Sequence, residues 1–191
     1  MPLSEPGRRE LLHLRDIQLR GWQRGDGLFD IEAHLLDRKA YDFENDDRGM
    51  MKAGDPLHGM WIRLTIRDDM EIVACEASSD HTPYALCPGA APNFARLAGL
   101  RIGPGFNRAV NERVGGVLGC THLREVLAQM ATVAFQTLYP IRARKEREEA
   151  ARIAAAGGTV PQRKPELVGT CIAYAPDSPV TLARWPWLRS P

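Results

Sequence analysis

The apolar residues of this chain change their spacing near residue 88, and this change constrains the fold more than any other feature. Before it they occupy every second position, as in Phe29, Ile31, Ala33 and Leu35. That is the period of a strand with one buried face. After it they recur every third or fourth position, as in a helix with one buried stripe. The sequence therefore predicts an α+β fold, with strands first and helices second.

The first half of the chain predicts two β-hairpins. The step Asp26-Gly27 favours a tight turn in the first, because Gly tolerates positive φ. Asp68-Asp69 supplies the turn of the second, while 42–55 reads as a polar loop and 38–43 as an extension of the strand before it. The four strands are predicted at 12–22, 28–36, 60–67 and 71–77. We expect one antiparallel sheet made of both hairpins.

The second half predicts helices that pack on one face of this sheet. Glycines end the two short helices, and Thr121 is a plausible N-cap of the longest one. We expect Pro140 to stop or kink that helix, and Leu167–Tyr174 to form a last strand. The helices are predicted at 88–97, 105–114, from 121 to Pro140, and 142–156. The buried stripe of the longest helix is Leu123, Val126, Leu127, Met130, Val133, Ala134 and Leu138.

Length and charge set the broad class. A chain of 191 residues suits one domain, which we place at 11–176, after a flexible leader at 1–10 and before a C-terminal tail at 177–191. A net charge of +1 gives no electrostatic reason to expect nucleic acid as a partner. We see no signal peptide and no apolar run of membrane-spanning length. We therefore expect a cytoplasmic protein with no membrane partner.

Cysteine and histidine form the first group of candidate site residues. The four cysteines lie far apart with no CxxC pair, so disulfides are not expected in a cytoplasmic context. Cys87 precedes a predicted helix, and Cys120 and His122 flank the start of the longest one. A thiol at a helix N-terminus is activated by the helix dipole, and such a set can also bind zinc or iron. Equally, both thiols could be small buried hydrophobes.

Two further groups carry titratable side chains. Asp30, Glu32 and His34 share one face of a predicted strand. They could perform acid–base chemistry or form a solvated face with cross-strand ion pairs. His58 lies where a loop enters the next strand, a common place for function, and Trp61 and Arg63 follow it on that strand. Solvent exposure is the ordinary alternative for Arg63.

Several motifs resemble a bacterial family known as domain-of-unknown-function family 2889. The resemblance extends from about residue 10 to 175. It is carried by Arg20-Gly21, Asp26–His34, Tyr41–Phe43, His58–Ile66 and Gly119–Leu123. It implies a small cytoplasmic protein that acts in bacterial breakdown of lignin-derived aromatic compounds. Such a protein would be an enzyme with a small aromatic substrate.

Residues 58–138 also resemble, more distantly, the iron–sulfur scaffold fold of the IscU and NifU type. The likeness places His58 near the first cysteine position of the scaffold, Cys87 at the second and Cys120 at the third. His122 follows Cys120, whereas the histidine of the scaffold precedes its last cysteine. This departure speaks against cluster assembly. It leaves a mononuclear metal site or a metal-free pocket as alternatives.

The resemblance to family 2889 implies a cofactor-independent lyase that releases formaldehyde from an aromatic dimer or opens an aryl-ether ring. His58 or His122 would act as the base, with Cys120 beside them. Tyr84 or Arg63 would stabilise a developing phenolate, and Trp61 and Tyr84 would stack on the ring. The other substrate-binding residues would be Cys87, Glu32 and His34.

The alternative is a zinc- or iron-binding carrier that holds its metal through Cys87, Cys120, His122 and His58. A purely structural partner of an enzyme complex is a third possibility. A homodimer is also expected, because Trp185 and Trp187 near the end of the chain are typical of an interface.

Overall fold

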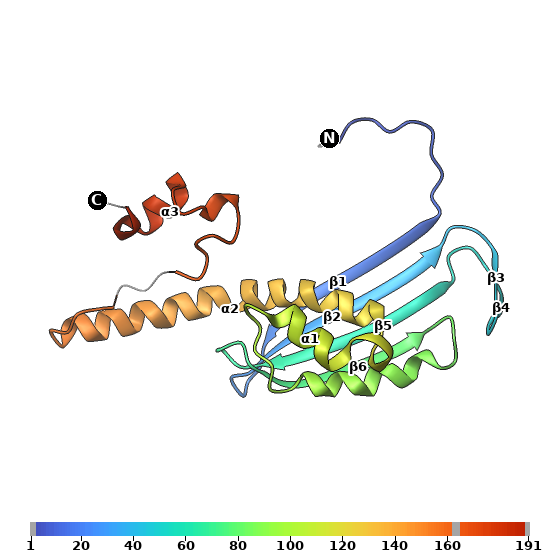
Figure 1. The fold of residues 1–191 in the computed structure, drawn as a ribbon, viewed down its shortest axis with the longest axis horizontal. Coiled ribbons are helices and arrows are strands. Elements are labelled where there is room, and N and C mark those ends of the chain that lie inside the picture. Colours follow the sequence, from blue (N-terminus) through green and yellow to red (C-terminus); the bar gives the residue numbers. More distant parts are fainter. Residues whose placement is uncertain (1–2, 162–164, 190–191) are drawn as a thin grey trace. The chain divides into compact units, whose positions relative to one another are not determined.

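The computed structural model describes residues 3–161 and 165–189, drawn as a ribbon in Figure 1. Antiparallel strands come first along the chain and helices follow, which confirms the predicted α+β class. The strands are β1 (His13–Gln23), β2 (Phe29–Lys39), β3 (Phe43–Asn45), β4 (Gly49–Met51), β5 (Pro56–Ile66) and β6 (Ile72–His81). The α-helices are α1 (Phe106–Val114), α2 (Thr121–Ala155) and α3 (Pro179–Arg184). The 3-10 helices are η1 (Cys87–Leu97), η2 (Gly116–Leu118), η3 (Ile172–Tyr174) and η4 (Pro186–Leu188).

Four strands form one antiparallel sheet in the order β1-β2-β5-β6. Both predicted hairpins are present, and Gly27 adopts the positive φ that the first turn requires. The two hairpins join through the long-range pairing of β2 with β5. The segment predicted as a loop at 42–55 contains a small separate hairpin, formed by β3 and β4.

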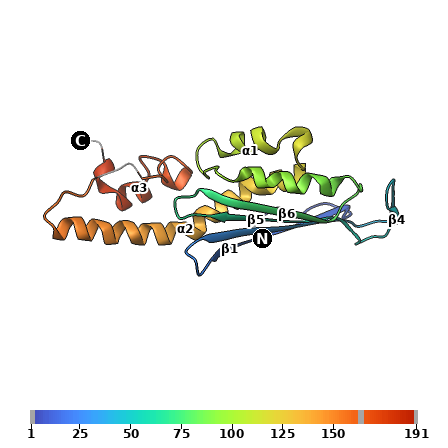
Figure 2. The ribbon, with the colours of Figure 1, turned by 90° about the horizontal axis from the view of Figure 1, so that it is seen from below.

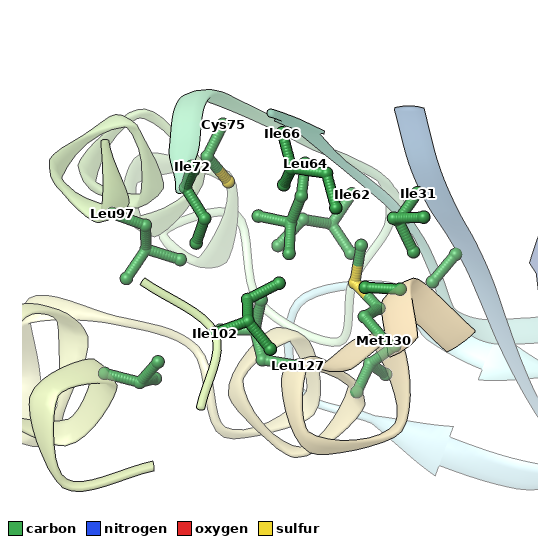
Figure 3. Close-up of a cluster of buried hydrophobic side chains, with 14 of the residues drawn as sticks. Ile31, Ile62, Leu64, Ile66, Ile72, Cys75, Leu97, Ile102, Leu127 and Met130 are labelled. Atoms are coloured by element: carbon green, nitrogen blue, oxygen red, sulfur yellow. The ribbon is translucent and has the colours of Figure 1, made fainter. Parts of the chain in front are cut away.

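The hydrophobic core lies on one face of this sheet. Figure 2 shows η1 and α1 on the same side of the strands, and the first part of α2 packs on that face as well. In Figure 3, Ile31 and Leu64 point from the strands toward Leu127 and Met130 of α2. Buried residues alternate with half-buried ones in β2 and with exposed ones over residues 60–64 of β5, because only one face of the sheet is covered.

The helix α2 comes very close to the edge strand β1 at Gly21. A Cβ atom built on Gly21 would lie 2.0 Å from Oγ1 of Thr137 and 3.0 Å from its Cβ and Cγ2. Thr137 is held in place because its hydroxyl donates to the carbonyl of Val133 at 2.8 Å. The absence of a side chain at residue 21 therefore permits the contact between helix and strand.

Two features of the second half differ from the prediction. Of the two outcomes expected at Pro140, a stop is excluded, because the helix α2 continues through Pro140 to Ala155. Pro140 has no N–H to donate to the carbonyl of Gln136, but Gln136 lies at an exposed position where water can bind that carbonyl. The predicted strand Leu167–Tyr174 is a turn followed by η3, because Gly169 has a φ of +88° and its N–H bonds the carbonyl of Tyr174 at 2.8 Å.

The chain divides into two compact units, residues 1–144 and 145–191. The first contains the sheet, η1, α1, η2 and most of α2. The second contains the end of α2 and the short helices η3, α3 and η4, with the side chain of Ser178 capping α3. The boundaries predicted at 11–176 and 177–191 stay a prediction. Within the part of the chain that is described, no helix has both the length and the hydropathy needed to cross a bilayer.

Replacing Gly21 tests the close approach of α2 to β1. We expect Gly21→Ala to lower the free energy of unfolding by about 1–3 kcal/mol, because the added methyl group overlaps Thr137. The double variant with Thr137→Ala should recover part of this loss. Urea denaturation provides the measurement. Gly25→Ala is the matched control, since a Cβ there would meet no atom within 4 Å, and an equal loss in this control would contradict the account.

Candidate functional site

A row of polar side chains crosses three strands on the face of the sheet that the helices cover. The buried positions of β2 alternate from Phe29 to Leu35, and Asp37 is the next residue on that face. The strand register places Asp37 opposite Arg15 of β1 and opposite His58 of β5. The hydrophobic row of β2 therefore ends in a carboxylate that lies between a guanidinium and an imidazole.

The pairing of β2 with β5 is irregular directly beside this row. Asp37 pairs with His58, but the following residue, Arg38, pairs with Pro56, so that Leu57 has no opposite residue on β2. A bulge of this kind bends the strand and changes the direction of nearby side chains, and bulges are frequent beside functional sites. The irregularity falls where the core row gives way to polar residues.

Asp37 is buried and accepts a bidentate pair of hydrogen bonds from the guanidinium of Arg15. Its side chain is 1% exposed. Nε of Arg15 donates to Oδ1 at 2.7 Å, and Nη2 donates to Oδ2 at 2.8 Å. The remaining nitrogen of Arg15, Nη1, lies 3.1 Å from Oε2 of Glu125 on α2. Nε2 of His13 lies 3.3 Å from Oδ1 of Asp37. Arg15 therefore connects the edge strand, the central strand and the covering helix.

The pKa of Asp37 reflects two opposed effects. Burial alone would raise the pKa of this carboxyl. The hydrogen bonds and the charge of Arg15 outweigh burial, with smaller contributions from His58 and His13, and hold the pKa of Asp37 below its usual range. The site therefore holds a buried negative charge at neutral pH.

His58 approaches this charge from β5. Its Nδ1 lies 3.1 Å from Oδ2 of Asp37, which is a hydrogen-bonding distance. The direction is poor for a hydrogen bond, however, and among the described residues this buried nitrogen has no well-directed partner. We therefore regard the pair as an electrostatic contact. A buried polar nitrogen without a directed partner is unusual in proteins and calls for an explanation.

The start of α2 brings a second imidazole to the cluster. The rings of His58 and His122 have centroids 3.9 Å apart and are tilted by 34°. Nε2 of His122 lies 3.9 Å from Oδ2 of Asp37, and its Nδ1 lies 3.8 Å from Sγ of Cys120. Gly119 permits this entry into the helix, because a Cβ there would lie 2.0 Å from the carbonyl oxygen of Val114.

Both imidazoles are neutral at pH 7. Burial, followed by the proximity of His122, lowers the pKa of His58 to about 4, and the charge of Asp37 offsets this only in part. Burial, followed by the positive charge of Arg15, also lowers the pKa of His122. A neutral imidazole has a free lone pair, which can accept a proton or bind a metal ion.

The cluster can therefore support either of two chemistries. A neutral imidazole beside a buried carboxylate can take up a proton, because the carboxylate stabilises the imidazolium that forms. Alternatively, ligand atoms of Asp37, His58 and His122 all lie within 4.8 Å of one another, close enough to share one metal ion. Two imidazoles and one carboxylate are ligands that zinc and iron accept.

The predicted site residues are divided between the two faces of the sheet. His58, His122 and Cys120 meet on the covered face. Trp61 and Arg63 of β5 are exposed on the opposite face, where the half-buried Glu32 and His34 of β2 lie beside them.

The residues of the open face contact one another. The rings of His34 and Trp61 stack at 3.9 Å with an angle of 10° between their planes. Arg63 is ion-paired with Glu32 at 3.7 Å and with Glu76 of β6. These ion pairs fit the structural alternative given above for the polar row of β2. Glu32, Trp61, Arg63 and Glu76 also line a shallow hollow of about 180 Å³.

Tyr84 and Cys87 lie at the same end of the sheet as the cluster but do not join it. β6 ends at His81, which pairs with Gly59, the neighbour of His58. Tyr84 follows in an exposed loop, and Cys87 is the first residue of η1. Among the residues that the structure describes, the group with metal-binding distances contains Asp37, His58 and His122, and neither Cys87 nor Cys120 of the predicted set belongs to it.

The sequence analysis missed Asp37, Arg15 and His13. A signal for Asp37 exists in the sequence, because it continues the alternation of Phe29–Leu35 and so occupies a core-facing position. A charged residue at such a position needs a partner. Arg15 could not be chosen as that partner without the register of the first hairpin.

Comparison with known proteins places the chain in a family. A family model described as "Protein of unknown function (DUF2889)" matches residues 13–136. The chain belongs to the DUF2889 family. The DUF2889 segment begins at the first residue of β1 and ends within α2, so it contains every member of the cluster described above. No curated protein and no solved structure matches the chain.

The lowered pKa of His58 predicts a pH-dependent stability. The unfolded chain takes up a proton at His58 near its ordinary pKa of 6.5, and the folded chain does so only at about 4. The unfolded state therefore binds more protons between these values, and the free energy of unfolding falls as the pH is lowered from 6.5 to 4, by on the order of 3 kcal/mol.

Urea denaturation across this pH range measures the effect. We expect His58→Gln to reduce the slope substantially, leaving the smaller contribution of His122. His34→Gln is the matched control, because it removes an imidazole on the open face of the sheet, outside the buried cluster. A His58→Gln variant with an unchanged slope would show that His58 is not the buried titrating group.

Proposed function

We propose that this DUF2889 protein is a lyase that acts without a cofactor on a small aromatic molecule. The observation that carries the proposal is the buried Asp37, which is fixed by Arg15 and lies beside two neutral imidazoles. The substrate class rests on the family resemblance, which implies bacterial breakdown of lignin-derived aromatic compounds. The release of formaldehyde from an aromatic dimer fits a site that offers a base and a stabilising charge.

His122 is the proposed base. Its side chain is 25% exposed, against 12% for His58, so a substrate can reach it more readily. It would remove the proton from a hydroxymethyl group of the substrate. As the new carbonyl forms, the C–C bond breaks and formaldehyde leaves. The electron pair of the broken C–C bond forms a C=C bond to the next carbon and expels the aryl-ether oxygen on that carbon as phenolate, which recovers the proton from the imidazolium. The reaction is balanced without an oxidant or a reductant.

The surrounding residues would support this proton transfer. The carboxylate of Asp37 stabilises the imidazolium, since Oδ2 lies 3.9 Å from Nε2 of His122. Arg15 and His58 act as positioning residues, because Arg15 fixes the carboxylate and the ring of His58 lies against that of His122. We assign no role in this step to Trp61 or Arg63, which lie on the opposite face of the sheet. Tyr84 stays a candidate for substrate contact.

Formaldehyde release from aromatic dimers with a hydroxymethyl side chain tests the proposal. We expect His122→Gln to lower kcat by at least about 100-fold, which is the usual contribution of a general base. Asp37→Asn should lower it as well. Glu112→Gln, on the exposed surface of α1, is the control and should retain the rate of the parent protein. Full activity of folded His122→Gln would rule out His122 as the base.

A metal-binding role is the second candidate, supported by the 4.8 Å cluster of Asp37, His58 and His122. The distant likeness to iron–sulfur scaffolds motivates the same idea, with Asp37 as a ligand in place of Cys87 and Cys120. One observation argues against it: Arg15 already donates to both oxygens of Asp37 and neutralises its charge. Metal analysis of the purified protein separates the candidates. Stoichiometric zinc or iron that is lost in His122→Gln, without formaldehyde release by the parent protein, would favour the metal-binding role.

A further inference from the structure

The two edges of the sheet are protected very differently. At the β6 edge, the segment after η1 covers the start of the strand: the N–H of Ile72 donates to the carbonyl of Leu100, and the N–H of Gly99 donates to the carbonyl of Ile72, both at 2.8 Å. Glu71 forms a bridge with Arg101 there. At the β1 edge, no strand of the described chain lies beside β1 on its outer side.

The strand β1 lacks most of the features that usually keep an edge strand from pairing with another chain. Natural sheets protect their edges with short strands, prolines, bulges or charged side chains, and of these β1 has only the charged side chains of Arg15, Asp16 and Arg20. β1 is 11 residues long, contains no proline, and pairs with β2 without a shift of register. Nine of its 11 residues are exposed, and only Ile17 and Leu19 are half-buried. Its outward N–H and C=O groups are therefore available to another strand.

The sequence of β1 is complementary to itself in an antiparallel arrangement centred on Gln18. In this register Asp16 of one copy faces Arg20 of the other, so opposite charges meet twice around the two-fold axis. Leu14 faces Trp22 on the open face of the sheet, and Ile17 faces Leu19 on the covered face. The large side chain of Arg15 faces Gly21, which has none. Like charges face each other nowhere along the strand.

We propose that β1 pairs with β1 of a second copy of this chain, around a two-fold axis at Gln18, to give one continuous eight-stranded sheet. Residues that face each other in this register lie on the same side of their sheets, so the covered faces of both copies stay on one side. The proposal does not depend on the chemistry of the site.

The backbone and side-chain contacts along β1 suffice for a specific interface between two copies of the chain. Eleven residues span roughly 36 Å at about 3.3 Å per residue, and alternate residues direct both backbone groups outward. Such a contact is isologous, as most homodimer interfaces are. The helix α2 lies along β1, with Glu125 at Arg15 and Thr137 at Gly21. The two copies of α2 would therefore approach each other across the same axis and enlarge the interface.

Charge reversal at Asp16 and Arg20 tests the pairing and its register. Asp16 contacts Arg38 within its own chain at 3.1 Å and is 50% exposed, so it can also face a second copy. Light scattering after size exclusion should give the mass of two chains for the parent protein. Asp16→Arg and Arg20→Asp alone should each weaken the dimer by about tenfold or more, because like charges then meet twice. An equimolar mixture of the two variants should recover a dimer of one copy of each.

Glu112→Arg, on the exposed surface of α1, is the matched control and should remain dimeric. Circular dichroism establishes that each variant is folded. A monomeric parent protein at micromolar concentration overturns the proposal. It is overturned equally by a dimer that neither reversal weakens, or by a mixture that does not form the mixed dimer.

Cross-linking locates the axis independently of affinity. Gln18→Cys, in a Cys171→Ser background that removes the exposed native thiol, should form a disulfide-linked dimer on mild oxidation. Residues directly opposite each other in an antiparallel pair have Cα atoms about 4.5–5.5 Å apart, within the reach of a disulfide. Trp22→Cys in the same background should not cross-link, because the proposed register places it opposite Leu14. The reverse pattern would overturn the proposed register.

Discussion

The ion pair between Arg15 and Asp37 is the interaction on which the rest of this structure depends. A carboxylate that is 1% exposed on the core side of a sheet is costly unless its charge is matched and its oxygens are hydrogen-bonded. The guanidinium of Arg15 does both, through one bond to each oxygen. It also reaches Glu125, so the same side chain ties β1 to β2 and to the covering helix. The chemistry of His58 and His122 follows from the charge that Arg15 keeps in place.

Local sequence patterns were sufficient to predict most of the fold. The Asp26-Gly27 turn fixes the first hairpin, and the apolar stripe from Leu123 to Leu138 identifies the helix that covers the sheet. The turn is a contact between residues close in sequence, and the stripe is a property of a single helix. The pairing of the two hairpins with each other could not be predicted from local patterns. β2 and β5 are separated by the β3–β4 hairpin, and nothing local in either strand specifies their register.

In the candidate site, too, local patterns identify some of the residues, whereas the contacts between them depend on the long-range pairing of the strands. His58 and His122 could be chosen from the sequence, because one enters a strand and the other begins a helix. That they meet each other, and that Asp37 lies between them and Arg15, follows only from the register of three strands. The face of the sheet on which a side chain lies then decides its environment. His34 and His58 are both histidines on strands of one sheet, yet one stacks on exposed Trp61 and the other lies against a buried carboxylate.

The most direct test of this account is an NMR titration of the five histidine imidazoles from pH 3 to 9. The ring of His58, assigned through the loss of its signal in His58→Gln, should stay neutral as the pH falls until it titrates with a pKa of about 4. In folded Asp37→Asn the same ring should titrate still lower, because the negative charge that favours its protonation is gone. A ring of His58 that titrates near 6.5, or that is unaffected by Asp37→Asn, would contradict the buried charge cluster at the centre of the account.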